Sequence, residues 1–114
     1  MVARPTNEQT SAAAAIPLWT AGQGGQPLGY EQITSINLAS PHRLNVPTGA
    51  TLAIIDIEGS AAVVRWRDDG VPPTATVGMP YAVGDPPMVY SAAITAIEFI
   101  TSAGSPTLNV TYYG

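Results

Sequence analysis

Short runs of alternating apolar and polar residues, separated by Pro- and Gly-rich turns, constrain the fold of this chain more than any other feature. Alternating positions share a face in a β-strand, and no convincing helical periodicity follows residue 20. The expected strands cover residues 33–38, 44–46, 51–58, 61–67, 79–83, 88–90, 94–100 and 107–113. This pattern predicts an all-β protein, a single small β-sandwich or jelly-roll-like domain.

Two of the runs predict burial residue by residue. In 51–58, one face carries Thr51, Ala53, Ile55 and Ile57, and the other carries Leu52, Ile54, Asp56 and Glu58. The first half of this run is apolar on both faces, which predicts a central strand whose carboxylates emerge as it leaves the core. In 107–113, one face carries Leu108, Val110 and Tyr112, and the other carries Asn109, Thr111 and Tyr113.

The N-terminal part has no strand pattern. Residues 1–20 are expected to form an arm, in which residues 7–15 could make two turns of helix that are marginal without a packing partner. The simplest interpretation is a frayed terminus, whereas an arm that is ordered without a core of its own is expected to be held by a neighbouring subunit. Residues 21–27 are a flexible connection by composition, and the β-sandwich domain is expected to span 21–114.

Composition excludes several classes of protein. Charged residues are 11% of the chain, less than half of the usual fraction of about 25%. This composition suits a chain packed against other subunits, with a small acidic monomer as the alternative. The net charge is −4 and lysine is absent, which argues against binding nucleic acid. Cysteine is also absent, so there is no disulfide framework. The apolar run near residue 16 is too short and too interrupted for a membrane span or a secretory signal.

The densest cluster of charge lies around the only tryptophan of the β-domain. Gly59 and Ser60 predict a hairpin turn that leads into 61–67, where Trp66 is expected to be a core anchor. Arg65 and Arg67 would then line the opposite face. The sequence Asp68, Asp69, Gly70 follows, and its composition predicts a tight turn rather than a metal loop.

The remaining polar residues do not form a recognisable catalytic set. Asp56 and Glu58 could act as an acid/base pair or bind a hard cation. The preferred interpretation is that they are solvated residues at a strand end that pair across the hairpin with Arg65 or Arg67. His42 is the only histidine, so a zinc site or a catalytic triad is not expected. We therefore expect no enzymatic activity, no metal and no cofactor.

Aromatic residues offer two interpretations. Trp19, Tyr112 and Tyr113 could form an exposed platform for a sugar, or they could belong to a packed protein interface.

Residues 44–114 resemble a group of small virion proteins of tailed bacteriophages. The most distinctive part is the Arg-Trp-Arg-Asp-Asp-Gly sequence at 65–70, followed by Pro-Thr-Ala-Thr at 73–76. Weaker similarities lie at 44–50, 57–59, 97–100 and 108–113. The resemblance implies a structural protein of the virion head, with a capsid decoration, or cement, protein as the most natural assignment.

The implied partners are the major capsid protein and further copies of the chain, as a trimer rather than a dimer. Such a protein is made in the host cytoplasm and lies on the outer surface of the virion capsid. An alternative implied role is a module of a head fibre or tail that binds a glycan or a partner protein.

Overall fold

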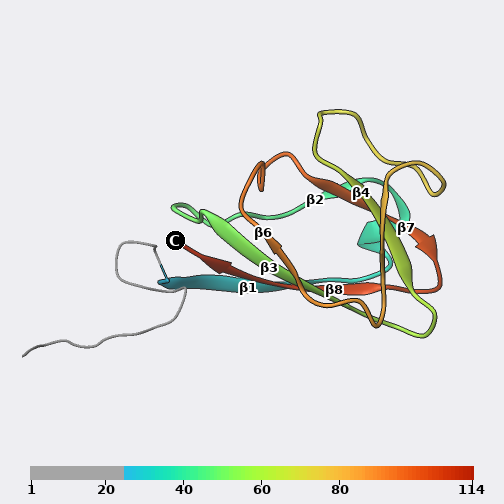
Figure 1. Ribbon diagram of the computed structural model, residues 1–114, viewed down its shortest axis with the longest axis horizontal. Coiled ribbons are helices and arrows are strands. Elements are labelled where there is room, and N and C mark those ends of the chain that lie inside the picture. The colour runs from blue at the N-terminus through green and yellow to red at the C-terminus, as the bar shows by residue number, and fades with distance from the viewer. Residues whose placement is uncertain (1–24) are drawn as a thin grey trace, which may run out of the picture.

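The computed structural model describes residues 25–114, which form two four-stranded antiparallel sheets packed face to face (Figure 1). The elements are β1 (Pro27–Ile33), the 3-10 helix η1 (Asn37–Ala39), β2 (His42–Arg43), β3 (Leu52–Glu58), β4 (Val63–Arg67), β5 (Met79–Ala82), β6 (Met88–Tyr90), β7 (Glu98–Ala103) and β8 (Thr107–Tyr113). Their number and pattern confirm the predicted all-β domain. The predicted arm, residues 1–20, lies outside the described residues.

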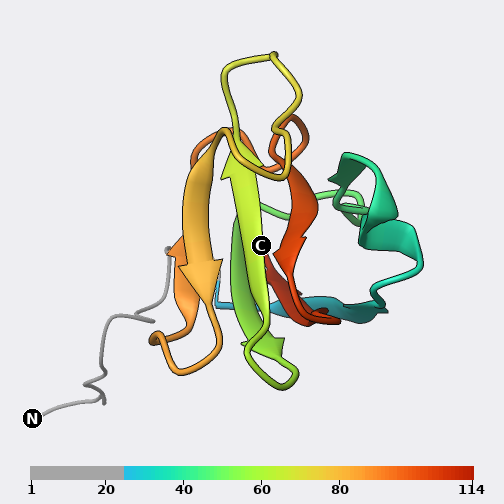
Figure 2. The same ribbon diagram turned by 90° about the vertical axis from the view of Figure 1, so that its right-hand side faces the viewer.

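The strand order defines the topology. One sheet has the order β1-β8-β3-β6 and the other β2-β7-β4-β5, so successive strands mostly alternate between the sheets. This is the arrangement of an eight-stranded jelly roll. In Figure 2 the strands β5, β4 and β7 lie side by side, and the β4–β5 loop (yellow) stands beyond their ends.

The core lies between the sheets and is made by the alternating residues that the sequence singles out. From β3 and β8, the buried side chains are Ala53, Ile55, Ile57, Leu108, Val110 and Tyr112, as predicted. From the facing sheet, Val64 and Phe99 are fully buried. The prediction that 51–58 is a central strand is also confirmed, because β3 pairs with β8 on one side and with β6 on the other.

Three of the predicted strands differ from the structure by more than two residues at an end or lie at other positions. The run 33–38 is not a strand: β1 covers Pro27–Ile33, where β8 offers a pairing edge, and Leu38 is buried in η1. Proline is tolerated at Pro27 because it is the first residue of an edge strand. The predicted strand 44–46 is replaced by the two residues of β2. The run 94–100 becomes a strand only at Glu98, because Ala96 and Ile97 donate backbone hydrogen bonds to the carbonyl of Ala93.

The predicted hairpin at Gly59 is wrong. β3 and β4 belong to different sheets, so this turn carries the chain across the sandwich. Its backbone lies against the β7–β8 turn: a Cβ at Gly59 would be 2.7 Å from the carbonyl oxygen of Ser105, and one at Gly104 would be 2.9 Å from that of Ser60. Both glycines have positive φ. The two turns therefore approach each other as closely as backbones allow.

Candidate functional site

Trp66 lies on β4, where charge and aromatic character coincide in the sequence. It is half-buried and packs against the core, with its ring centroid 6.1 Å from that of Tyr90 in an edge-to-face arrangement. The prediction that Trp66 is a core anchor is thus only partly right. Because β4 ends at the next residue, the indole lies at the margin of the core rather than inside it.

Tyr90 contacts the end of β4 from the opposite sheet. Its hydroxyl donates a hydrogen bond to Oδ2 of Asp68 and accepts one from the backbone N–H of Ala93 at 3.2 Å. Burial, and then the hydrogen bond to Asp68, raises the pKa of the Tyr90 phenol. The Tyr90 hydroxyl therefore fixes the position of the Asp68 carboxylate, although Tyr90 belongs to β6 of the other sheet.

The turn after β4 is held by a bidentate pair between Arg67 and Asp69. Arg67 donates from Nε to Oδ1 at 3.1 Å and from Nη2 to Oδ2 at 2.5 Å. This bonding lowers the pKa of Asp69 and raises that of Arg67. Asp69 also accepts a bond from Val71 N–H, and Gly70 has a φ of +87°. The predicted turn chemistry is confirmed.

The predicted charge pairs between this strand and β3 do not form, because the two strands lie in different sheets. Arg65 instead donates from Nη1 to the carbonyl of Gly78 at 2.8 Å. On β3, Asp56 accepts a hydrogen bond from the N–H of Ile57, and Glu58 accepts one from the side-chain amide of Asn109 at 2.8 Å. Both carboxylates are exposed, as expected for a strand end.

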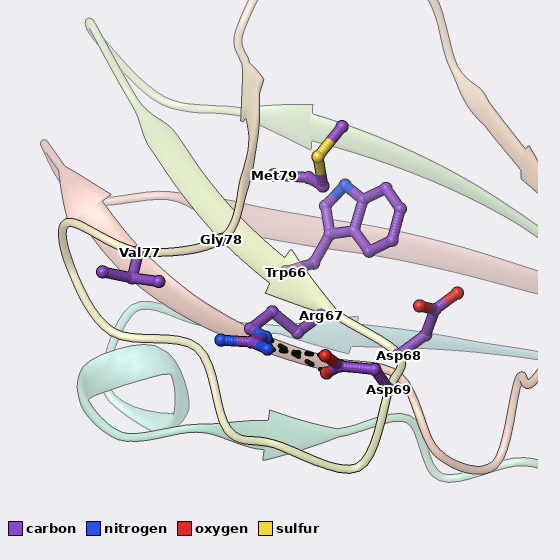
Figure 3. A pocket seen from close by; sticks show the side chains of 7 residues that line it. All are labelled: Trp66, Arg67, Asp68, Asp69, Val77, Gly78 and Met79. Atoms are coloured by element: carbon purple, nitrogen blue, oxygen red, sulfur yellow. Dashed lines mark hydrogen bonds and ion pairs between the residues drawn. The ribbon is translucent and has the colours of Figure 1, made fainter.

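The β4–β5 loop is built from local hydrogen bonds. Thr74 Oγ1 accepts bonds from the N–H groups of Thr76 and Val77, and Ser102 Oγ donates to the carbonyl of Ala75 at 2.7 Å. Where this loop meets the strands it leaves a cavity of about 250 Å³. We call it the corner pocket, and its lining residues, drawn in Figure 3, are Trp66, Arg67, Asp68, Asp69, Val77, Gly78 and Met79.

A second feature is the outward face of the β1-β8-β3-β6 sheet. The register aligns Tyr30, Thr111, Ile54 and Val89 across all four strands. We call these residues the apolar row. Its end members, Tyr30 and Val89, are 62% and 64% exposed. The same face becomes polar beyond the row, where Asn109 accepts hydrogen bonds from Tyr30 and Gln32.

The predicted aromatic platform does not exist as proposed. Tyr112 is 1% exposed and its hydroxyl donates to Oε2 of Glu31, so it is a core residue and not an interface residue. Alternation requires this, since Tyr112 shares its face with Leu108 and Val110. Tyr113 points outward beside the apolar row and is half-buried. Trp19 lies outside the described residues.

The free energy of unfolding is expected to decrease at high pH because of Tyr112. Burial, followed by the bond to Glu31, raises the pKa of Tyr112 far above its ordinary value. The unfolded chain loses this proton near pH 10 while the folded chain keeps it. The contribution of Tyr112 to stability is thus fully present below about pH 10. Above that pH it declines by about 1.4 kcal/mol per pH unit.

The check is chemical denaturation of the wild type and of Tyr112→Phe between pH 8 and about 11. The variant should be less stable at pH 8 by about 1–2 kcal/mol because it lacks the hydrogen bond, and its decline at high pH should be shallower. Some decline remains, since burial also raises the pKa of Tyr81. Equal slopes in the two proteins would contradict the assignment.

Within residues 25–114, no group of three or more His, Asp or Glu residues is placed to hold a metal ion, and no helix is long and apolar enough to cross a membrane. Comparison with protein-family models, with curated proteins and with solved structures found no match. The fold and the two surfaces described above are therefore the basis for inferring function.

Proposed function

We propose that this chain is a non-enzymatic structural protein of a bacteriophage virion, a decoration protein that binds the outer surface of the head and stabilises the shell. The observation that carries the proposal is the apolar row. The register places Tyr, Thr, Ile and Val side chains in one row across the whole sheet, with Tyr30 and Val89 exposed at its ends. Exposed apolar side chains that adjoin one another can mark an interaction surface.

The fold and the composition support the same role. Eight-stranded jelly rolls are common in viral capsid proteins, although a fold alone does not define a function. The outward face of the sheet carries Asp56 and Glu58 at one end and no arginine. The apolar row can therefore pack against the major capsid protein or another copy without burying a charge of its own.

In this role the protein acts mechanically. Copies that bridge adjoining capsid subunits, as trimers on local threefold axes, add buried interface where the shell would otherwise separate. Rupture by internal pressure then requires breaking these contacts as well, so decorated particles should withstand more heat than undecorated ones.

The test uses phage particles assembled without the chain, to which purified protein is added back. Copies bound per particle are counted by quantitative mass spectrometry and located by electron cryomicroscopy. We expect on the order of hundreds of copies spread over the head, as the symmetry of a shell requires, and a higher temperature of particle rupture. Around a dozen copies or fewer at one vertex would refute the proposal.

A charge placed in the apolar row should weaken this binding. Val89→Glu introduces a carboxylate at a side chain that is 64% exposed, so the fold should tolerate it. Burial of that charge in the interface should reduce affinity for particles at least about tenfold. The matched control is Gln32→Glu, which adds the same charge to the polar part of the same face. Equal binding by the two variants would show that the row is not the contact surface.

A further inference from the structure

The corner pocket combines an aromatic wall, an apolar wall and a carboxylate. Trp66 and Met79 are direct cross-strand neighbours on β4 and β5, so their side chains lie on the same side of the sheet. In Figure 3, Trp66 and Asp68 project to one side of the chain, whereas Arg67 turns the other way to meet Asp69. The indole and the Asp68 carboxylate therefore face the same space.

The charges of the pocket leave one carboxylate uncompensated. Arg67 and Asp69 neutralise each other through their two hydrogen bonds. Asp68 has no cationic partner within the described part of the chain: its Oδ2 accepts from the neutral Tyr90 hydroxyl, and its Oδ1 accepts no bond there. The pocket thus carries one net negative charge beside an aromatic ring, which favours a cationic ligand over an anionic or neutral one.

We propose that the corner pocket binds the side chain of an arginine presented by a partner protein. A guanidinium is planar and stacks on an indole, while its N–H groups donate to a carboxylate. Asp68 directly follows the last residue of β4, so the Cα atoms of Trp66 and Asp68 are at most about 7 Å apart, which lets one guanidinium lie over Trp66 and reach Asp68. Met79 would contact the aliphatic stem.

Each arginine in the described part of the chain already has a partner within the same copy, which favours an arginine from a different protein. Arg43 pairs with Glu98, Arg65 bonds to the carbonyl of Gly78, and Arg67 pairs with Asp69. The pocket is also preformed, because Tyr90 and the loop hydrogen bonds hold its walls. The identity of the partner as the capsid protein rests on the proposed function, whereas the chemistry of the pocket does not.

The experiment is an NMR titration of the full chain with N-acetyl-arginine methylamide, followed at the indole N–H of Trp66. The matched neutral probe is N-acetyl-citrulline methylamide, which has nearly the same shape without the charge. We expect saturable shifts in the millimolar range with the arginine probe and at least fivefold weaker binding of the citrulline probe. Equal binding of the two probes would overturn the proposal.

Two variants locate the site. Asp68→Asn keeps an oxygen that can accept the Tyr90 hydrogen bond but removes the charge, and should weaken the arginine probe at least fivefold. Asp56→Asn removes an exposed carboxylate on the other sheet and should leave the binding unchanged. Equal effects of the two substitutions would overturn the proposal.

If Asp68→Asn does not fold, the salt dependence of binding to the wild-type protein still tests the proposal. Binding of the arginine probe must weaken as salt rises, and binding of the citrulline probe must not. Salt-independent binding of the arginine probe would overturn the proposal. None of these measurements requires a capsid, so a failure here is distinct from a failure of the particle-binding test.

Discussion

Replacing Phe99 with alanine is expected to lower the free energy of unfolding by about 3–5 kcal/mol. Phe99 is fully buried on β7, which lies between β2 and β4, and its side chain is among the largest that are fully buried in residues 25–114. A domain of this size has a total stability of only about 5–15 kcal/mol. The substitution therefore removes roughly a fifth or more of the stability, and urea denaturation measures the loss directly.

The loss of stability in Phe99→Ala should be compared with the loss in Trp66→Ala. Tryptophan has the larger side chain, so a rule based on size alone predicts the larger loss for Trp66. The structure predicts the reverse, because Trp66 is only half-buried at the margin of the core. A loss at Trp66 equal to or greater than the loss at Phe99 would mean that the indole is more deeply enclosed than described.

Replacing Gly59 with alanine is expected to destabilise the domain by about 2–4 kcal/mol, a large effect for one methyl group. Gly59 has a φ of +129°, and an added Cβ would be 2.7 Å from the carbonyl oxygen of Ser105 and 3.0 Å from the Cβ of Ala62. Neither neighbour is a flexible side-chain end. The β3–β4 and β7–β8 turns would therefore have to separate, as a lowered melting temperature would report.

Gly84 is the control that separates backbone strain from steric contact. It also has a positive φ, +96°, but an added Cβ would meet no atom within 4 Å. Gly84→Ala should therefore cost only the strain of the left-handed conformation, about 1–2 kcal/mol. Equal losses at the two glycines would show that the close approach of the turns contributes nothing.

The sequence predicts burial within a strand better than it predicts how the strands connect. The alternation in β3 and β8 identifies the buried residues correctly because the period of two is a local property of the backbone. The turn at Gly59 is different. A glycine permits the chain to reverse, but whether the next strand pairs with the last or crosses to the other sheet depends on β8, almost fifty residues away.

The same limit applies to the candidate sites. The turn at Asp69 and Gly70 was predictable because its hydrogen bonds are local. The role of Tyr90 was not, since Tyr90 lies 22 residues from the carboxylate that it holds. The apolar row was also hidden, because its four members come from four strands and align only through the register of the sheet.

The order of the strands also determines when this surface can exist. Of the strands in residues 25–114, only β4 and β5 are both consecutive and paired, so most of the fold must wait for distant segments to meet, which makes folding slow. β1 pairs with β8, which is synthesised about eighty residues later. A growing chain on the ribosome therefore has no complete apolar row, and the row forms only when β8 has joined the sheet.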